Sequence, residues 1–336
     1  MNMANAQNVN LLEQLLNDSE NDLINIKIAN KDNFHLARSI IEDIKILKSY
    51  GLKIRNYNKI IEYGLYFENK LTIVEKPSFL YLYNLFELLR LGLQNGFIIT
   101  SIKDCPCRHI YLNGDKIQIY SGQSFYLASI DPFTLVETFF LNIHYMSIYK
   151  EMTVLDIGAE AGDSSIFFAS KGARVYAVEP VRKNYLALLK NLTLNKDLSN
   201  NITPINVAHG ENNTVTIYSD PMRIDGTASV FSNSNTKIKE KVEGLSIKSI
   251  LKKLDMCDVD LLKLDSKGGE FSVSASDLKC VNKYVKIEYM ITRDNEKIDV
   301  ILQNMAEAGF DWFILNHNPW NKSLKTHGTI YGIRHI

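Results

Sequence analysis

Cysteine, tryptophan and proline are scarce in this chain: its 336 residues include 4 Cys, 2 Trp and 7 Pro. Four scattered cysteines are too few for the disulfide framework that staples small secreted domains. Only Cys105 and Cys107 lie close together, and a metal site there could add only the nearby His109. We therefore expect free thiols and no metal site.

An excess of charge is missing as well, because 38 Lys and Arg balance 38 Asp and Glu. A dedicated nucleic-acid binder normally carries a basic face, so we expect no nucleic-acid partner. No uninterrupted apolar run reaches the length of a bilayer span, and the polar first ten residues lack a signal-peptide pattern. The sequence predicts a cytoplasmic protein without a membrane span.

The chain is longer than one average domain, which favours more than one. Residues 1–104 predict a mainly helical N-terminal domain, because apolar residues recur there at helical spacing. Their apolar stripe predicts core packing or the surface of a homodimer, with a substrate lid as the alternative.

Residues 105–150 predict a hairpin and a helix that lead into a domain at 151–336. Asn113-Gly114 is the dipeptide that a tight two-residue turn prefers. Asp131-Pro132 opens a helix that we expect to run to about Tyr149.

From residue 151 onward, apolar strands and helical segments alternate, which predicts a parallel sheet covered by helices on both faces. A loop joins the last two strands, so we expect them to form an antiparallel hairpin at the sheet edge. The polar stretch 219–240 predicts one long loop. The expected strands lie near residues 153–157, 174–179, 202–207, 260–265, 283–289, 311–316 and 328–334, and the clearest helices near 182–195 and 296–308.

The most informative segment is a strand, a glycine turn, a helix start and a second strand that ends in an acid. The first strand ends at Asp156, Gly158 and Gly162 make the turn, and Glu179 follows 23 residues after Asp156. At this spacing an acid reaches the ribose of a bound nucleotide. The turn lacks the G-x-G-x-x-G pattern, and its carboxylates disfavour a diphosphate. A cofactor with an ammonium, a sulfonium and a ribose, S-adenosylmethionine, fits better.

The stretch Val154-Leu-Asp-Ile-Gly-Ala-Glu-Ala-Gly-Asp-Ser-Ser-Ile-Phe-Phe-Ala169 resembles the first motif of FkbM-type S-adenosylmethionine-dependent methyltransferases. Val178-Glu179-Pro180, the segment 260–270 and Ile287-Glu288-Tyr289 resemble later motifs, and the resemblance covers about residues 131–334. It implies a class I methyltransferase Rossmann-like fold, an α/β fold with a seven-stranded, mostly parallel sheet and an antiparallel C-terminal hairpin. It also implies S-adenosyl-L-methionine as cofactor and a hydroxyl of a small molecule or glycan as acceptor.

Ligands bind outside the carboxyl ends of the strands in open α/β sheets, so polar strand ends mark the expected site. We expect Asp156 and Gly158 at the methionine side, Glu179 at the ribose, and Asn206 or Val207 at the adenine. The full set of cofactor-binding candidates is Asp156, Gly158, Glu160, Gly162, Asp163, Ser164, Glu179, Pro180, Asn206, Val207 and Asp265. The catalytic candidates are Asp265, which we expect to face the methyl group, and the proton acceptors Glu270, Glu288 and His209.

Two residues depart from the family pattern. Glu160 stands where the family usually has Asn, and Lys267 stands where it usually has Glu. A Glu160–Lys267 ion pair would compensate both changes. The departures leave activity open, so the alternative is a catalytically silent binding or assembly module on the same fold. A nicotinamide dehydrogenase is a third interpretation.

Overall fold

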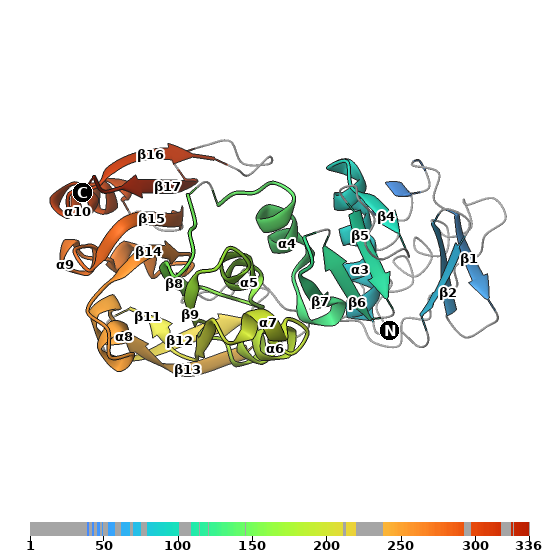
Figure 1. Ribbon diagram of the computed structural model, residues 1–336, viewed down its shortest axis with the longest axis horizontal. Coiled ribbons are helices and arrows are strands. Elements are labelled where there is room, and N and C mark those ends of the chain that lie inside the picture. The colour runs from blue at the N-terminus through green and yellow to red at the C-terminus, as the bar shows by residue number, and fades with distance from the viewer. Residues whose placement is uncertain are drawn as a thin grey trace, which may run out of the picture. The chain divides into compact units, whose positions relative to one another are not determined.

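The computed structural model describes the chain in two compact units, Met1–Leu141 and Asn142–Ile336. Figure 1 shows both as ribbons. The described residues are 39, 42–43, 46–47, 49, 53–57, 62–67, 70–74, 79–100, 109–113, 115–119, 121–144, 146–210, 213–219, 238–291, 297–316, 324, 326 and 327–335. Cys105, Cys107 and most of the segment expected to form a homodimer surface lie outside them. Within these ranges, none of the helices has the length and apolar character to cross a bilayer.

The first unit combines two small sheets with helices. Strands β1 (Lys53–Tyr57), β2 (Glu62–Phe67) and β3 (Lys70–Val74) form an antiparallel three-stranded sheet. A second sheet has the order β4-β5-β6-β7, made of Ile98–Thr100, His109–Asn113, Lys116–Ile119 and Ser124–Tyr126. Helix α3 (Phe79–Gln94), the short η2 (Leu127–Ser129) and helix α4 (Pro132–Phe139) complete the unit.

The first unit departs from the sequence-based expectation in two places. The prediction of a mainly helical region is wrong for residues 53–74, where three strands pair instead. The helix that begins at Pro132 ends at Phe139 rather than near Tyr149, and soon afterwards Asn142 takes a left-handed backbone with φ of 50°. This conformation does not continue a right-handed helix, and Asn tolerates it better than most residues. The expected hairpin is confirmed, because β5 and β6 pair antiparallel.

The division between the units also differs from the expected one, in which residues 105–150 lead into the domain at 151–336. The hairpin and α4 belong to the first unit because they pack on α3. The Asn84 side chain of α3 donates hydrogen bonds to the carbonyls of Leu127 and Ile130, and the ring of Phe97 stacks on Phe140. The second unit therefore begins at Asn142.

The second unit contains a seven-stranded sheet with the order β10-β9-β8-β14-β15-β17-β16. All neighbouring pairs are parallel except those of β17, which runs antiparallel to both β15 and β16. This order and the antiparallel strand define the class I methyltransferase Rossmann-like fold that we expected. The strands are β8 (Thr153–Ile157), β9 (Arg174–Val178), β10 (Ile202–Ile205), β14 (Val259–Leu264), β15 (Val281–Met290), β16 (Asp311–Leu315) and β17 (His327–Ile333).

Helices cover both faces of this sheet, as the alternation of strands and helices predicts (Figure 1). One face carries α5 (Asp163–Ser170), α6 (Arg182–Leu192) and α7 (Lys196–Ser199). The other carries α8 (Ile247–Lys253), α9 (Ala275–Leu278), α10 (Ile298–Glu307) and the short η3 (Glu270–Ser272). Apolar side chains of α8, α9 and α10 pack with those of β14 and β15 into the main core of the unit.

A small sheet of three strands was not expected. Its order is β11-β13-β12, made of Ala208–His209, Ile238–Leu245 and Thr214–Ser219. Strand β13 alternates Lys and Glu rather than showing an apolar run, and the sequence therefore placed its start in a long loop. Residues 220–237 of that loop, including the segment 225–229, lie outside the described residues.

Candidate active site

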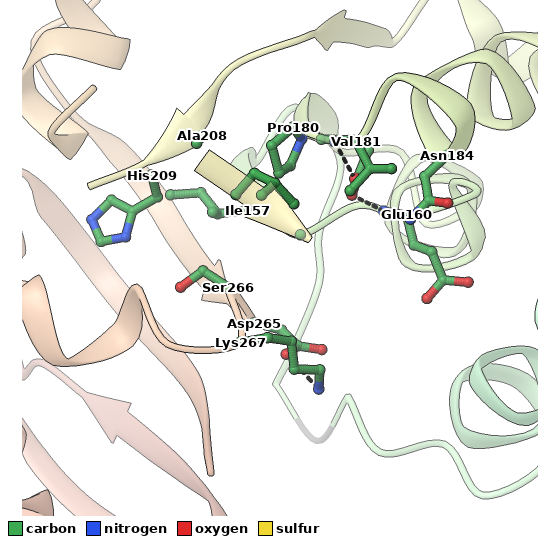
Figure 2. Close-up of a pocket in the computed structure, with 13 residues that line it drawn as sticks. Ile157, Glu160, Pro180, Val181, Asn184, Ala208, His209, Asp265, Ser266 and Lys267 are labelled. Carbon is green, nitrogen blue, oxygen red and sulfur yellow. Dashed lines mark hydrogen bonds and ion pairs between the residues drawn. The ribbon is translucent and has the colours of Figure 1, made fainter. Parts of the chain in front are cut away.

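A hollow opens at the carboxyl ends of β8, β9 and β14, and the small sheet forms part of its wall (Figure 2). It holds about 530 Å³, counted with the solvent-filled space at its mouth. The lining residues are Ile157, Gly158, Glu160, Glu179, Pro180, Val181, Asn184, Ala208, His209, Ile217, Asp265, Ser266 and Lys267.

Glycine at position 158 lets the first turn pass close to the end of β14. Gly158 has φ of 78°, and a Cβ there would lie 1.9 Å from the carbonyl oxygen of Asp265. The amides of Gly158 and Ala159 both donate to the carbonyl of Val178, at 2.9 and 3.0 Å. Because two strands approach the turn this closely, no larger residue fits.

Asp156 supports this turn from below and does not line the hollow. Its side chain is fully buried. One carboxylate oxygen accepts hydrogen bonds from the hydroxyls of Ser164 and Ser165, at 2.7 and 2.6 Å. The other lies 3.0 Å from the ammonium of Lys263. Asp156 therefore holds the start of α5 and a buried lysine rather than pointing into the site.

Glu179 is the acid that the second strand brings to the hollow. Its two carboxylate oxygens accept hydrogen bonds from the backbone amides of Glu160 and Val181, both at 2.9 Å. Burial raises the pKa of this carboxyl to about 7, although the two amides and the Lys263 ammonium act to lower it. Each oxygen can accept a second hydrogen bond, because a carboxylate has about four lone-pair sites.

An apolar wall faces Glu179 and belongs largely to the small sheet. Val181, Ala208 and Ile217 form a buried apolar cluster, and all three line the hollow. Asn206 lies nearby, but its amide donates to the carbonyls of Glu179 and Pro180, at 2.8 and 3.0 Å. Val207 is buried in the main core. Neither residue lines the hollow.

Charged side chains form a chain at the other end of the hollow, beyond Asp265. The ammonium of Lys267 lies 2.7 Å from Asp265 and 3.1 Å from Glu288, whose carboxylate lies 3.5 Å from Nε2 of His327. Burial opposes the charges, yet the two acids hold the pKa of Lys267 well above its usual value. Burial would raise the pKa of Glu288, but Lys267, His327 and Lys286 hold it well below its usual range.

Two of the expected proton acceptors are poorly suited to that role. Glu270 is 1% exposed and accepts hydrogen bonds from the amides of Gly268 and Met290, at 2.6 and 3.3 Å. Burial raises its pKa to about 7, which would suit a general base, but its side chain does not line the hollow. His209 lines the hollow at the end away from Glu160 and Asn184 (Figure 2), and burial lowers its pKa to about 4. Its imidazole is therefore neutral at pH 7 and a weak base.

Some of the expected site residues therefore line the hollow, and others do not. The expected residues that line the hollow are Gly158, Glu160, Glu179, Pro180, His209 and Asp265. Those that do not line it are Asp156, Gly162, Asp163, Ser164, Asn206, Val207, Glu270 and Glu288. Among the described residues, no three His, Cys, Asp or Glu side chains are grouped to hold a metal ion.

The sequence reasoning missed the apolar wall, Ser266 and Lys263. Ala208 and Ile217 belong to the unexpected small sheet, so no signal pointed to them. Lys263 did carry a signal, because a lysine within the apolar run of β14 must be paired when it is buried.

The sequence from Asp156 to Asp311 matches the family model of the methyltransferase FkbM domain. The chain carries a methyltransferase FkbM domain. The matched segment begins at the last but one residue of β8 and ends at the first of β16, so it includes every residue that lines the hollow. None of the curated proteins matches the chain.

Solved structures similar to this chain include several methyltransferases. The magnesium protoporphyrin IX methyltransferase of Synechocystis PCC 6803, with bound SAM, is 11% identical, with 60% of this chain and 78% of that chain covered and a TM-score of 0.36. An O-methyltransferase from Bacillus cereus in complex with SAH is 12% identical, with 55% and 74% covered and a TM-score of 0.34. A precorrin-6y C5,15-methyltransferase from Geobacter metallireducens GS-15 is 11% identical, with 56% and 82% covered and a TM-score of 0.34.

The two departures from the FkbM pattern both line the hollow of this FkbM domain. Lys267 pairs with Asp265 and Glu288, and Glu160 lies across the hollow beside Asn184 (Figure 2). The expected Glu160–Lys267 pair is therefore wrong. Both residues have a left-handed backbone, with φ of 47° and 46°. Such strain in residues other than glycine is concentrated at functional sites.

Proposed function

We propose that this chain is an S-adenosyl-L-methionine-dependent methyltransferase that transfers the methyl group to a hydroxyl oxygen of a small molecule or glycan. The observation that carries the proposal is the position of Glu179 in the hollow. Its carboxylate lies on the wall of the hollow, two backbone amides fix its position, and an apolar wall faces it. The match to the FkbM domain supports methyl transfer as the reaction class.

The residues of the hollow suit the parts of this cofactor. The free lone pairs of Glu179 can accept hydrogen bonds from two ribose hydroxyls. The adenine ring can pack on Val181, Ala208 and Ile217. The carboxylates of Glu160, Glu179 and Asp265 attract the positive charge of the sulfonium and ammonium groups. The same carboxylates would repel the negative charges of a diphosphate, which argues against a dinucleotide.

The bound cofactor supplies an electrophilic methyl group, and the chain positions the acceptor and handles its proton. Asp265 is the carboxylate that lines the hollow beside the charged chain, so it can accept a hydrogen bond from the acceptor hydroxyl. Lys267 fixes Asp265 from the other side. Glu288 and His327 continue this chain of polar groups away from the hollow and help to hold Lys267 in place.

Calorimetry with S-adenosylhomocysteine tests the proposal without knowledge of the acceptor. The full chain should bind it, and Glu179→Gln should weaken binding by about tenfold or more, since a hydrogen bond to a charged group contributes about 1.5–3 kcal/mol. Glu307→Gln is the matched control, because Glu307 is exposed and pairs only with Lys279 in the described part of the chain. Absence of heat with the wild-type chain would contradict the proposal and favour a silent assembly module.

A further inference from the structure

Lys263 is a charged residue in the middle of an apolar strand. Strand β14 reads Val-Asp-Leu-Leu-Lys-Leu, and Lys263 is only 7% exposed. Removing an ammonium from water costs several kcal/mol unless partners compensate for it. An apolar residue would fill the same place in the sheet at no such cost, so a buried lysine here needs a physical reason.

The ammonium of Lys263 joins β14 to the glycine turn after β8. It donates a hydrogen bond to the carbonyl of Gly158 at 2.7 Å and lies 3.0 Å from the Asp156 carboxylate. That carboxylate also accepts hydrogen bonds from Ser164 and Ser165 at the start of α5. One lysine thus connects the end of a strand, the turn and, through Asp156, the next helix.

The turn itself is held at each of its amides by the neighbouring strand β9. The amides of Gly158 and Ala159 donate to the Val178 carbonyl, and the amide of Glu160 donates to the Glu179 carboxylate. From β14, the Lys263 side chain donates a hydrogen bond to the Gly158 carbonyl of the same turn. Gly158 and Glu160 both line the hollow, so a shift of the turn would change its shape.

We propose that Lys263 is a positioning residue that holds the Gly158–Glu160 turn in the shape that the adenosyl cofactor requires. The proposal rests on the proposed function, because it assigns Lys263 a role in forming that same site. Lys263 does not line the hollow and acts through Gly158 and Glu179.

The charge of Lys263 affects the pKa of Glu179, so the pH dependence of cofactor binding can reveal its role. A purely structural role would leave that pH dependence unchanged. Burial opposes the charge, but Asp156, Asp265 and Asp163 outweigh burial and raise the pKa of Lys263 above its usual value, so the ammonium persists at neutral pH. The same ammonium lowers the pKa of Glu179. Loss of Lys263 should therefore raise the pH below which Glu179 becomes protonated and cofactor binding weakens.

The test compares four proteins in calorimetry with S-adenosylhomocysteine and in thermal unfolding. They are the wild-type chain, Asp156→Asn, the double variant Asp156→Asn/Lys263→Met and the double variant Asp156→Asn/Lys263→Gln. Both double variants remove the two charges together, which avoids an unpaired buried carboxylate. Ser164 and Ser165 can still donate to the amide oxygen of the new Asn side chain, and the Gln side chain keeps a donor for Gly158.

We expect Asp156→Asn to keep its affinity within about threefold, because Asp265 and Asp163 still favour the Lys263 ammonium and Gly158 still accepts its hydrogen bond. Asp156→Asn/Lys263→Met should lose about tenfold or more, which is 1.4 kcal/mol or more. The Gln double variant should recover part of this loss, and both double variants should lose affinity at a higher pH than the wild-type chain does. Affinity and pH midpoint equal to wild type in the Met double variant would overturn the proposal. So would a loss in Asp156→Asn as large as in that double variant.

Should the Met double variant not fold, the Gln double variant decides the question. A pH midpoint that stays at the wild-type value would overturn the proposal, and an upward shift would support it. Failure of the wild-type chain to bind S-adenosylhomocysteine would contradict the proposed function instead, so the two failures are distinguishable.

Discussion

The Glu179 carboxyl experiences two opposing effects. Burial disfavours its charge, whereas two backbone amides and the Lys263 ammonium favour it, and its pKa lies at about 7 as a result. A carboxyl in this position changes charge near neutral pH, where ordinary glutamates are fully ionised. A ligand held by Glu179 would therefore bind with an affinity that depends on pH in the neutral range.

We predict that affinity for S-adenosylhomocysteine falls as pH decreases from 8 to 6. Below the pKa of Glu179 the loss should approach about tenfold per pH unit, because the protonated carboxyl accepts ribose hydrogen bonds less well. Calorimetry at several pH values measures this effect. In Glu179→Gln the affinity should be lower and nearly independent of pH over the same range. An equally steep pH dependence in that variant would assign the effect to another group.

Sequence reasoning identified the acidic strand ends but not their individual roles. Asp156 and Glu179 both end apolar strands, so the pattern treated them alike. Their roles diverge because Ser164, Ser165 and Lys263 surround Asp156, whereas Glu179 accepts hydrogen bonds from two backbone amides and lines the hollow. Such differences depend on contacts between distant segments, which spacing along the chain does not encode.

At the scale of elements, the first turn is the most constrained part of the site. A Cβ at Gly158 would overlap the backbone of Asp265, which cannot move without displacing the end of β14. Gly309, after α10, has a similar backbone with φ of 83°, but a Cβ added there would meet no atom within 4 Å. Alanine substitution at Gly309 therefore measures backbone strain alone, and substitution at Gly158 adds steric overlap.

We predict that Gly158→Ala is severely destabilising and that Gly309→Ala is mild. Left-handed backbone costs alanine about 1–2 kcal/mol, which is all that Gly309→Ala should lose. Gly158→Ala should lose several kcal/mol more because two strands must also separate. Chemical denaturation measures both values. Equal losses in the two variants would show that the turn can relax, and would contradict the close approach of β8 and β14.

The order of elements was far more predictable than their detail. The expected strands of the main sheet are confirmed close to their boundaries. Buried parallel strands such as β8 read as continuous apolar runs, which makes them easy to place. The small sheet of β11, β12 and β13 was missed because β13 alternates charged residues, a pattern also typical of exposed loops. Helix α4 proved shorter than expected because a left-handed Asn142 follows it.

At the scale of the whole molecule, the second unit includes a short segment before its first strand. The hydroxyl of the buried Tyr331 donates to the carbonyl of Ile143 at 2.6 Å. The ring of His144 packs against Phe167 and Phe168, and its Nδ1 lies 3.3 Å from the ammonium of Lys286. This segment packs on the second unit and provides hydrogen-bond partners for polar groups of β15 and β17.

We predict that residues 142–336 fold alone and bind S-adenosylhomocysteine within about threefold of the full chain, because they supply every lining residue of the hollow. A fragment of residues 151–336, which starts at the boundary expected from the sequence, should unfold several degrees lower. Loss of a partner for a buried polar group costs about 1–3 kcal/mol, and 1 kcal/mol shifts the melting temperature by about 2–4 °C at this size. Equal melting temperatures would contradict the role of Ile143 and His144.

Ser164, Ser165 and Lys263 enclose Asp156, and this affects what the presence of Asp156 in a related chain can indicate. Since this aspartate pairs with buried groups of the fold and does not line the hollow, selection on the architecture alone would preserve it. A related chain without methyltransferase activity could keep Asp156 unchanged for as long as it kept this fold. Under the proposed function, Glu179 and the apolar wall are the better markers of a retained cofactor site.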